Sequence, residues 1–237
     1  MEIITCKDNE ELSAKAAEII INKVTEGPNA VLGLATGSTP VKTYENLIQA
    51  YKDGKVSFKN VTTFNLDEYV GLAPDHSNSY THFMNEQLFD HIDIDKEKTH
   101  IPNGLADKSE KESEDFEQKI AEQGPIDLQI LGLGLNGHIG FNEPGTPFNQ
   151  RTHVVELDEI TRQSNARFFD ELSQVPTHAI SMGIGTIMEA KEILLLVHGV
   201  QKADILKEVV HGEVTEKVPA SILQTHPNVK VITDIEF

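Results

Sequence analysis

A glycine-rich segment at residues 131–145, LGLGLNGHIGFNEPG, presents His138 and Glu143 in one loop, with Asn136 two residues upstream of the histidine. Histidine can accept and release protons near neutral pH, and a carboxylate or amide beside it can fix its tautomer and tune its basicity. A lone histidine is more often structural, but one in a glycine-rich loop close to an acid favours catalysis. The segment therefore predicts that His138 takes part in proton transfer.

The same segment also matches a dinucleotide-binding motif, although the surrounding sequence argues against one. Gly132, Gly134 and Gly137 fit G-x-G-x-x-G, with an acid about twenty residues further on. The motif requires a helix that begins at the glycines and holds the pyrophosphate. Two glycines and two prolines between residues 140 and 147 oppose such a helix. An NAD-dependent oxidoreductase therefore rests on three glycines alone, and no metal site is expected because no second His or Cys lies at ligand spacing from His138.

Residues 36–40, TGSTP, are a candidate anion-binding loop between a predicted buried strand and a predicted helix. Small residues such as Gly37 let backbone N–H groups approach an anion, and the N-terminus of the following helix adds a favourable dipole. Ser38 and Thr39 can add hydroxyl donors. An ordinary capped turn without a ligand explains these residues equally well, so both interpretations stay open.

Asp67 lies in the segment NLDEY, residues 65–69, where a second buried strand is expected to end. Partial desolvation at a strand end raises the pKa of a carboxyl group toward values suited to a general base. A polar strand end without catalytic function is the alternative, and the pentapeptide by itself favours that alternative.

Basic residues are few and unevenly distributed: 20 Lys and Arg oppose 38 Asp and Glu, so the net charge is −18. The only three arginines are Arg151, Arg162 and Arg167, and the planar guanidinium group binds phosphate or carboxylate bidentately. Their clustering indicates either an anion site or chance in a lysine-biased composition. Lys202 begins a predicted helix, where the dipole disfavours a cation, which is a mild indication of function.

The composition excludes several classes of protein. A net charge of −18 opposes broad binding to nucleic acid or to an anionic membrane. One cysteine excludes an intramolecular disulfide framework, and no apolar run approaches the ~20 residues of a membrane-spanning helix. No secretory signal follows Met1. We therefore expect a globular, cytoplasmic protein that folds as a single domain over residues 1–237.

Apolar strands alternate with amphipathic helices along the chain, which predicts an α/β fold with a mostly parallel sheet and helices on both faces, Rossmann-like and doubly wound. Strands are predicted at residues 2–4, 30–35, 61–65, 127–133, 153–157, 179–182, 193–197 and 229–232. Helices are predicted from Asn9 as N-cap to Val24, after Pro40, and at residues 77–89, 107–123, 158–170, 186–190, 201–210 and 219–224. Ligands in such folds bind beyond the carboxyl ends of the strands, where the candidate loops lie.

Six segments together resemble the glucosamine-6-phosphate deaminase family. They are LATGSTP (34–40), FNLDEYVGL (64–72), LGLGLNGHIGFNEPG (131–145), TRQSNARFF (161–169), SMGIGTIMEA (181–190) and GVQKA (199–203). They occur in the family's order and at similar spacing over nearly the whole chain. Each segment is weak evidence alone, whereas the set is highly specific.

The resemblance implies an enzyme without a cofactor that converts glucosamine 6-phosphate and water to fructose 6-phosphate and ammonia in amino-sugar catabolism, which we class as a hydrolase. It implies that Asp67 moves a proton from the amine-bearing carbon to the anomeric carbon. It also implies that His138 opens the sugar ring, assisted and oriented by Glu143 and Asn136. The phosphate-binding residues implied by the resemblance are Gly37, Ser38, Thr39, Arg167 and Lys202.

One residue departs from the pattern of some family members, which carry Asp where this chain has Asn136. A neutral amide can orient an imidazole ring, but it cannot stabilise the imidazolium as a carboxylate does. We therefore expect Asn136→Asp to change the pH–rate profile.

Longer members of the family extend beyond the end of this chain and form allosteric oligomers. Because this chain stops at Phe237, we expect a monomer without an effector site for N-acetylglucosamine 6-phosphate. Residues 148–169 are a candidate lid over the substrate.

Two alternative functions stay open at this stage. A 6-phosphogluconolactonase shares this kind of fold and phosphate loop, but residues 64–72 and 137–145 fit the deaminase family better. A non-catalytic sugar-phosphate-sensing module would need a DNA-binding segment, and the acidic chain with its short N-terminus does not offer one.

Overall fold

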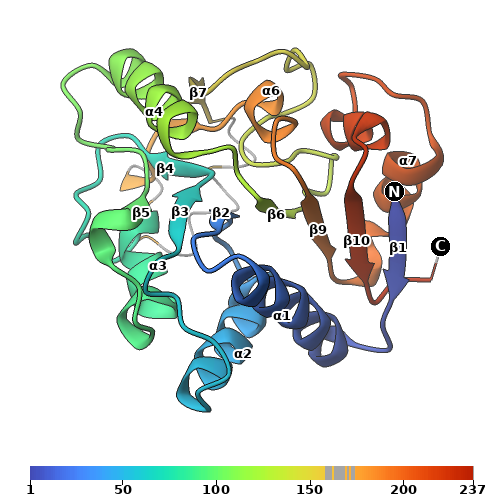
Figure 1. Ribbon diagram of the computed structural model, residues 1–237. Coiled ribbons are helices and arrows are strands. Elements are labelled where there is room, and N and C mark those ends of the chain that lie inside the picture. Colours follow the sequence, from blue (N-terminus) through green and yellow to red (C-terminus); the bar gives the residue numbers. More distant parts are fainter. Residues whose placement is uncertain (158–161, 163–168, 170, 172–173, 237) are drawn as a thin grey trace.

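A seven-stranded sheet forms the centre of the computed structural model, which describes residues 1–157, 162, 169, 171 and 174–236 (Figure 1). The strand order is β1-β10-β9-β6-β2-β3-β5, and every neighbouring pair is parallel. The strands are β1 (Glu2–Thr5), β2 (Val31–Leu34), β3 (Thr62–Asn65), β5 (Thr99–His100), β6 (Leu128–Gly132), β9 (Ile193–Val197) and β10 (Val229–Thr233). The predicted parallel α/β sheet is confirmed, and the short edge strand β5 is an addition to it.

The strand order reverses between β2 and β6, which are neighbours in the sheet. From β2 the chain builds outward through β3 and β5, and from β6 it builds the other way through β9 and β10. In open parallel sheets this switch point leaves a crevice beyond the carboxyl ends of the two central strands. The loops that follow β2 and β6 are the TGSTP loop and the His138 loop, so the topology sets the two candidate loops beside one crevice.

Helices cover both faces of the sheet, as Figure 1 shows. One face carries α1 (Asn9–Glu26), α2 (Val41–Lys52) and α3 (Tyr80–Gln87), and the other carries α4 (Ser109–Gln123), α6 (Ile184–Ile187), α7 (Ala203–His211) and the 3-10 helix η6 (Pro219–Thr225). Shorter 3-10 helices are η1 (Phe89–His91), η2 (Lys96–Lys98) and η5 (Val200–Lys202). Consecutive residues Leu194 and Leu195 of β9 pack into the opposite hydrophobic clusters, which explains why the central strands are apolar at nearly every position.

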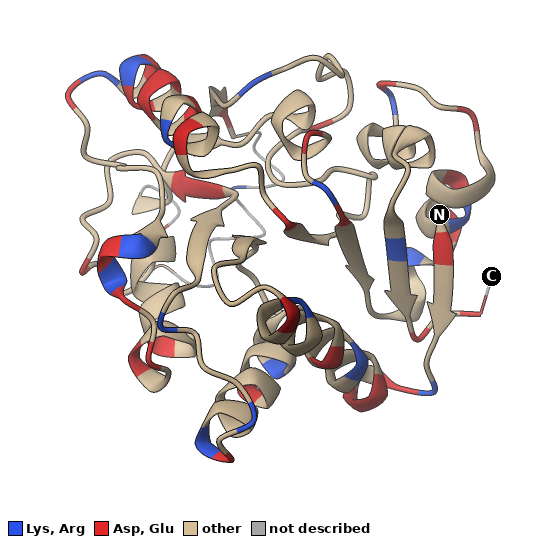
Figure 2. Cartoon of the chain, in the orientation of Figure 1, with Lys and Arg blue, Asp and Glu red and all other residues tan. Residues whose placement is uncertain are grey.

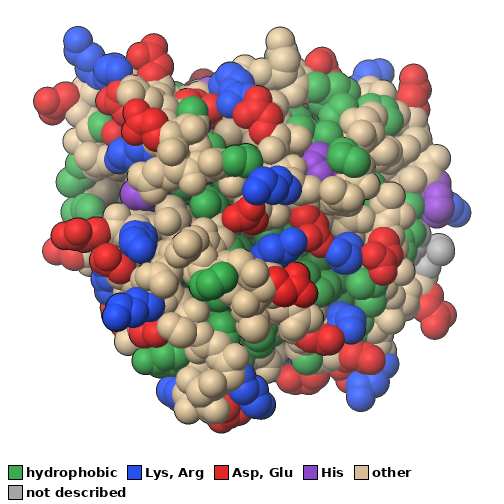
Figure 3. Space-filling model, viewed as in Figure 1, with side chains coloured by type: hydrophobic (Ala, Val, Ile, Leu, Met, Phe, Trp, Pro, Cys, Tyr) green, Lys and Arg blue, Asp and Glu red, His purple; other side chains and the backbone are tan. Residues whose placement is uncertain are grey.

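Helix α1 has its N-cap one residue earlier than its sequence suggests. The side chain of Asp8 accepts a hydrogen bond from the backbone N–H of Glu11, so Asp8 is the N-cap and the prediction of Asn9 is wrong by one residue. Acidic and basic residues share the exposed faces of α1 and α4, and Figure 2 shows both signs along these helices. The face in Figure 3 likewise mixes basic and acidic side chains, so the net charge does not gather there into a single patch.

A second, three-stranded sheet lies at the side of the molecule and is antiparallel throughout. Its order is β4-β8-β7, from β4 (Asp67–Tyr69), β8 (His178–Ser181) and β7 (His153–Glu156). The sequence predicts β7 and β8 as strands but assigns them to the main sheet, whereas the structure pairs them with β4. Asp67 was expected in a loop, and it instead opens β4 opposite Ser181.

Two predicted features extend beyond the described part of the chain. The helix at residues 158–170 lies almost entirely outside the described residues, and so does the second half of the lid at residues 148–169. The lid, like the assignment of residues 1–237 to one domain, stays a prediction. Among the described helices, none combines the length and apolar character needed to cross a membrane.

Candidate active site

The TGSTP loop joins β2 to α2 and presents backbone donors at a cavity of about 580 Å³. Gly37 adopts φ of +88°, a conformation that favours glycine, and Pro40 stands at the N-cap of α2. Among the described residues no side chain caps α2, and its first turn contains no acid, so its N-terminal N–H groups keep their positive potential for a ligand. Gly37, Ser38 and Thr39 all line the cavity, as an anion-binding loop requires.

Lys202 lines the same cavity from the opposite half of the sheet. It ends η5 and stands at the N-cap of α7, after a turn that begins at Gly199 with φ of +98°. Within the described residues no carboxylate lies close enough to form an ion pair with it, and burial lowers the pKa of its amine. A partly desolvated ammonium group that no described carboxylate neutralises is suited to an anionic ligand.

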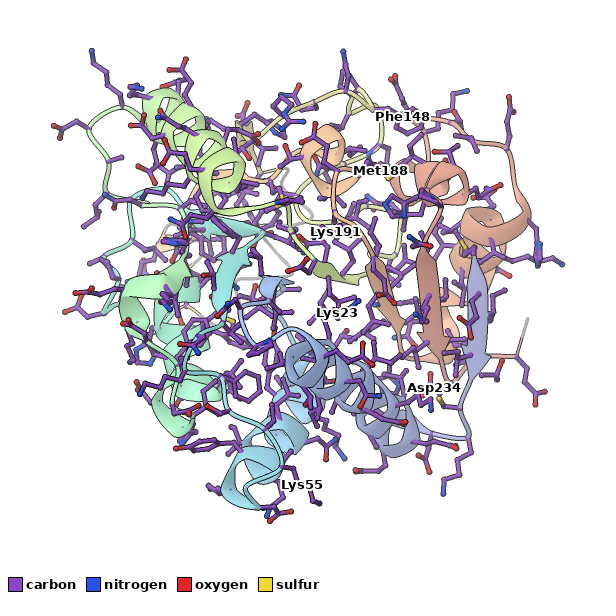
Figure 4. The ribbon with its side chains drawn as sticks, in the orientation of Figure 1. Lys23, Lys55, Phe148, Met188, Lys191 and Asp234 are labelled. Atoms are coloured by element: carbon purple, nitrogen blue, oxygen red, sulfur yellow. The ribbon has the colours of Figure 1, made fainter. Side chains whose placement is uncertain are left out.

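The turn that carries Lys202 is fixed by Asp234, which follows β10 and is labelled in Figure 4. One oxygen of Asp234 lies 2.5 Å from Nδ1 of His198, and the other accepts a hydrogen bond of 3.1 Å from the backbone N–H of Gly199. The sequence shows no partner for His198, because Asp234 is 36 residues away. The pair of His198 and Asp234 therefore fixes the start of the turn at the ends of β9 and β10, which are neighbours in the sheet.

His138 lies in a hydrogen-bonded chain with Asn136 and Glu143, as the spacing of these residues suggested. Nδ1 of His138 lies 2.7 Å from Oδ1 of Asn136, and the amide nitrogen of Asn136 donates to Oε2 of Glu143 at 2.6 Å. The other oxygen of Glu143 lies 3.3 Å from Nδ1. Because both neighbours of Nδ1 are acceptors, the neutral ring carries its proton there and leaves Nε2 to exchange protons with a ligand.

Asp67 is a buried carboxylate directly behind the His138 loop. It is 6% exposed, and among the described residues its side chain accepts no hydrogen bond. A Cβ atom at Gly140 would lie 3.8 Å from Oδ2 of Asp67 and 3.2 Å from Oγ of Ser181, so the loop passes within contact distance of the acid. Burial, together with the negative charge of Glu68, raises the pKa of Asp67 to about 8.

An aromatic wall completes the cavity, and none of its residues was predicted as part of the site. Tyr69, Tyr80 and Phe169 line the cavity, and the rings of Tyr69 and Tyr80 lie 4.8 Å apart. The ring of Phe169 contacts Tyr69 edge-on at 6.3 Å. The DEY triplet that contains Tyr69 was noted only for its aspartate, and the alternation of side chains along a strand would have placed Tyr69 on the same side as Asp67.

The two described arginines, Arg151 and Arg162, contact different partners. Arg151 forms ion pairs with Glu117 of α4 and with Glu189, so its role is to fasten the start of β7. Arg162 donates to the carbonyl oxygen of Val175. Arg167, the arginine implied in phosphate binding, lies outside the described residues.

The geometry of the His138 loop explains why the glycine motif does not indicate a dinucleotide site. Residues 133–152 form turns and bends with no helix, so no helix N-terminus stands at Gly137 to hold a pyrophosphate. Over the part of the chain that the structure describes, no group of three or more His, Cys, Asp or Glu side chains is arranged to hold a metal ion.

Comparison with known protein families matches residues 7–232 to the model of the glucosamine-6-phosphate isomerases/6-phosphogluconolactonase family. The chain belongs to this family. A glucosamine-6-phosphate deaminase from Shouchella clausii is 57% identical over all of this chain and 96% of its own length. One from Thermoanaerobacter pseudethanolicus is 53% identical over all of this chain and 93% of its own length.

Solved structures of the isomerase/lactonase family agree with this assignment. A monomeric glucosamine-6-phosphate deaminase superposes with a TM-score of 0.96 at 49% identity, covering 98% of this chain and 97% of its own. A 6-phosphogluconolactonase from Trypanosoma brucei has a TM-score of 0.78 at 18% identity, over 98% of this chain and 95% of its own. The second likeness shows the shared fold alone.

The expected enzyme class needs one correction. From the family resemblance we expected a hydrolase. The family matched here is named for isomerases, and the relatives at 51–57% identity are named deaminases. The class of hydrolase is therefore wrong, since the family and these relatives are named for isomerases and deaminases.

Proposed function

We propose that this chain catalyses the deaminating aldose–ketose isomerisation of glucosamine 6-phosphate, which takes up water and yields fructose 6-phosphate and ammonia. The observation that carries the proposal is the buried Asp67 carboxylate behind the His138 loop, since proton transfer between adjacent carbons needs one base that reaches both. Relatives more than 50% identical over the whole chain are named for this activity.

The phosphate group of the substrate binds at the N-terminus of α2. The N–H groups and hydroxyls of Gly37, Ser38 and Thr39 surround it, and the ammonium group of Lys202 supplies the positive charge. Arg167 belongs to this set by family resemblance. Binding energy gained at the phosphate end positions the reacting carbons at the other end of the sugar.

His138 opens the pyranose ring. Nε2 of the neutral ring accepts the proton of the anomeric hydroxyl group, and the resulting imidazolium returns a proton to the ring oxygen as the C1–O5 bond breaks. Asn136 and Glu143 hold Nδ1 and fix the tautomer during both steps. The product is the open-chain aldehyde with its amine still on C2.

Asp67 then moves one proton between C2 and C1. Its carboxylate removes the C2 proton, the electron pair of that bond forms a C1–C2 double bond, and O1 takes up a proton from solvent. Return of the proton from Asp67 to C1 produces an iminium group at C2. Water adds to this carbon, one proton returns to solvent and ammonia leaves, which accounts for the products. A raised pKa suits both halves, since the same group must first accept the proton and then release it.

An assay of the products formed from glucosamine 6-phosphate tests the proposal, and we expect ammonia and fructose 6-phosphate in equal amounts. Substrate deuterated at C2 sharpens the test, because a single base predicts that part of the deuterium is found at C1 of the product. Deuterium found only in the solvent would contradict a sheltered Asp67, and no ammonia release would overturn the reaction itself. Hydrolysis of 6-phosphogluconolactone at a comparable rate would favour the lactonase alternative.

Oligomeric state and location complete the proposal. A monomer is supported by the 49% identical structure, which is described as a monomeric deaminase. Light scattering over a range of protein concentrations tests it, and activation by N-acetylglucosamine 6-phosphate with cooperative kinetics would contradict it. A cytoplasmic enzyme follows from the proposed use of a phosphorylated intermediate of sugar catabolism.

A further inference from the structure

Glu68 is a second buried acid beside the proposed base, and the reaction proposed above gives it no role. It is only 2% exposed, and its carboxylate accepts four hydrogen bonds. One oxygen accepts from the backbone N–H groups of Tyr69 and Tyr80, each at 2.9 Å. The other accepts from the N–H of Thr81 at 2.9 Å and from its hydroxyl group at 3.0 Å. A buried carboxylate with four donors is a built feature and not a surface charge.

These bonds cap a helix from outside its own sequence. Tyr80 and Thr81 are the first two residues of α3, and the N-cap Ser79 accepts from the third, His82. Glu68 and Ser79 together therefore pair the first three N–H groups of the helix. The first turn of α3 contains no acid, so the carboxylate that its dipole favours is supplied by β4.

The capped end of α3 forms one wall of the substrate cavity. Residues 77–80 and Phe83 line the cavity, and Tyr80 packs against Tyr69 of β4. The hydroxyl of Tyr80 also lies 3.3 Å from that of Tyr69. Glu68 thus fastens the cavity wall to the strand that carries the base.

We propose that Glu68 is a positioning residue for the deamination reaction, which clamps the start of α3 to β4 and keeps a second negative charge beside the base Asp67. This inference rests on the proposed function for its kinetic consequences only. The clamp and the charge are properties of the protein without substrate.

The charge of Glu68 acts on Asp67 because no cation of the described residues compensates for it nearby. Burial raises the pKa of Asp67, and the negative charge of Glu68 raises it further. Tyr69 of β4 and Tyr80 of α3 also face this region, but burial raises the pKa of Tyr69 to about 12 and that of Tyr80 further, so both stay neutral. On β8 the residue opposite Asp67 is Ser181, which does not titrate, and the adjoining loop carries His138 and Glu143.

The substitution Glu68→Gln separates the charge from the shape of the side chain. A glutamine keeps one acceptor oxygen and replaces the other with an NH2 donor, so in either orientation it faces backbone N–H groups that Glu68 now accepts from. We expect the carboxyl titration of Asp67, followed by carbon NMR in the free protein and assigned by its loss in Asp67→Asn, to shift to lower pH by roughly one unit. We expect the backbone N–H groups of Tyr80 and Thr81 to exchange with solvent roughly tenfold faster. The acid limb of the pH–rate profile should move in the same direction as the titration.

A matched variant and a companion variant complete the experiment. Glu110→Gln removes an exposed acid in the first turn of α4, away from the cavity, and should leave every readout unchanged. Thr81→Val removes one donor but keeps the charge, so amide exchange should quicken while the titration of Asp67 stays in place. Because this variant keeps Glu68, it tests the clamp even if Glu68→Gln does not fold.

Two results would overturn the inference. One is an unchanged Asp67 titration in folded Glu68→Gln, and the other is unchanged amide exchange at the start of α3 in Thr81→Val. Both are measured without substrate, so they stand even if the protein releases no ammonia. Failure of the inference and failure of the proposed reaction are therefore distinguishable.

Discussion

The two sheets divide the work of the candidate site between them. The parallel sheet supplies the residues that we propose bind the phosphate, from the loop after β2 and the turn after β9, and it supplies His138 from the loop after β6. The small antiparallel sheet supplies Asp67 and, beside it, Glu68. In the proposed reaction, binding and carbon chemistry therefore depend on parts of the fold with different topology.

The two parts also use opposite electrostatics. At the end of the parallel sheet, backbone N–H groups, a helix N-terminus and Lys202 offer positive potential to a charged ligand. At β4, two buried carboxylates lie next to each other, and burial together with the negative charge of Glu68 makes Asp67 a stronger base. We infer that preorganised donors supply the affinity for substrate. Desolvation of Asp67 supplies the reactivity, although it lowers the stability of the folded protein.

The substitution Asp67→Asn tests the difference between the two sheets and has the largest expected effect. Removing a general base that acts directly on carbon should lower kcat by about a thousandfold or more, whereas KM and the affinity for a non-reactive substrate analogue should change less than about threefold. Steady-state ammonia release and isothermal titration with the analogue measure the two quantities. Asp107→Asn, at a position away from the cavity, is the control. A large loss of analogue affinity in Asp67→Asn would show that the two sheets do not divide the work in this way.

The same variant should change stability in the opposite sense to activity. The pKa of Asp67 is raised in the folded protein, so the folded state binds more protons than the unfolded state between about pH 4 and pH 8. The free energy of unfolding of the unmodified protein therefore falls as the pH rises through this window and levels off above it. The amide introduced by Asp67→Asn cannot ionise, so the variant should match the unmodified protein only at about pH 3.5, where Asp67 is neutral in both the folded and the unfolded state.

At pH 9 the Asp67→Asn variant should be the more stable of the two. The expected gain in the free energy of unfolding is a few kcal/mol, since each pKa unit corresponds to roughly 1.4 kcal/mol. Urea denaturation at both pH values measures it. Equal stability of the two proteins at pH 9 would show that Asp67 is not held in a costly ionised state.

The two sheets also differ in how well the sequence predicts them. The parallel sheet was predictable because buried apolar runs alternate with amphipathic helices, and the loops at its carboxyl edge follow from that topology. His138, Lys202 and the TGSTP loop were therefore predictable as neighbours of one crevice. The small sheet was not, because β4 is three residues long and its partner β8 is more than 100 residues away. No local periodicity reports such a pairing.

Separation along the sequence also explains which residues near the site were not predicted. The partners of Glu68 lie 12 and 13 residues along the chain, and Asp234 fixes the turn of Lys202 through Gly199, which is 35 residues away. These contacts depend on how strands and helices meet in space. The one local sign was the start of α3, whose first turn lacks the acid that a helix N-terminus favours.

Lys202→Met tests the proposed phosphate site at the end of the parallel sheet, and its expected effect is intermediate. The substitution keeps the length and apolar stem of the side chain but removes the charge and its hydrogen bonds to phosphate. Loss of a charge-assisted bond of about 1.5–3 kcal/mol predicts a KM that rises roughly ten- to a hundredfold. The pH dependence of kcat should stay in place, because Asp67 is untouched. Lys207→Met, on the exposed side of α7, is the matched control, and an unchanged KM in Lys202→Met would remove the lysine from the phosphate site.

The smallest expected effect concerns Asn136, the residue between His138 and Glu143. Asn136 accepts from Nδ1 of His138 and donates to Glu143, so it relays between them as a neutral group. Asn136→Asp would place a carboxylate 2.7 Å from the ring, which stabilises the imidazolium, but it would also oppose two carboxylates where a hydrogen bond of 2.6 Å now lies. We expect the pH–rate profile for ring opening to shift to higher pH by less than about one unit, with the turnover at its optimum little changed. An unchanged profile would show that Asn136 acts through geometry alone. A shift would show that the charge of the residue hydrogen-bonded to His138 sets the pH dependence of ring opening. A neighbouring charge would then act on His138, in a loop of the large sheet, as we propose that Glu68 acts on Asp67 in the small sheet.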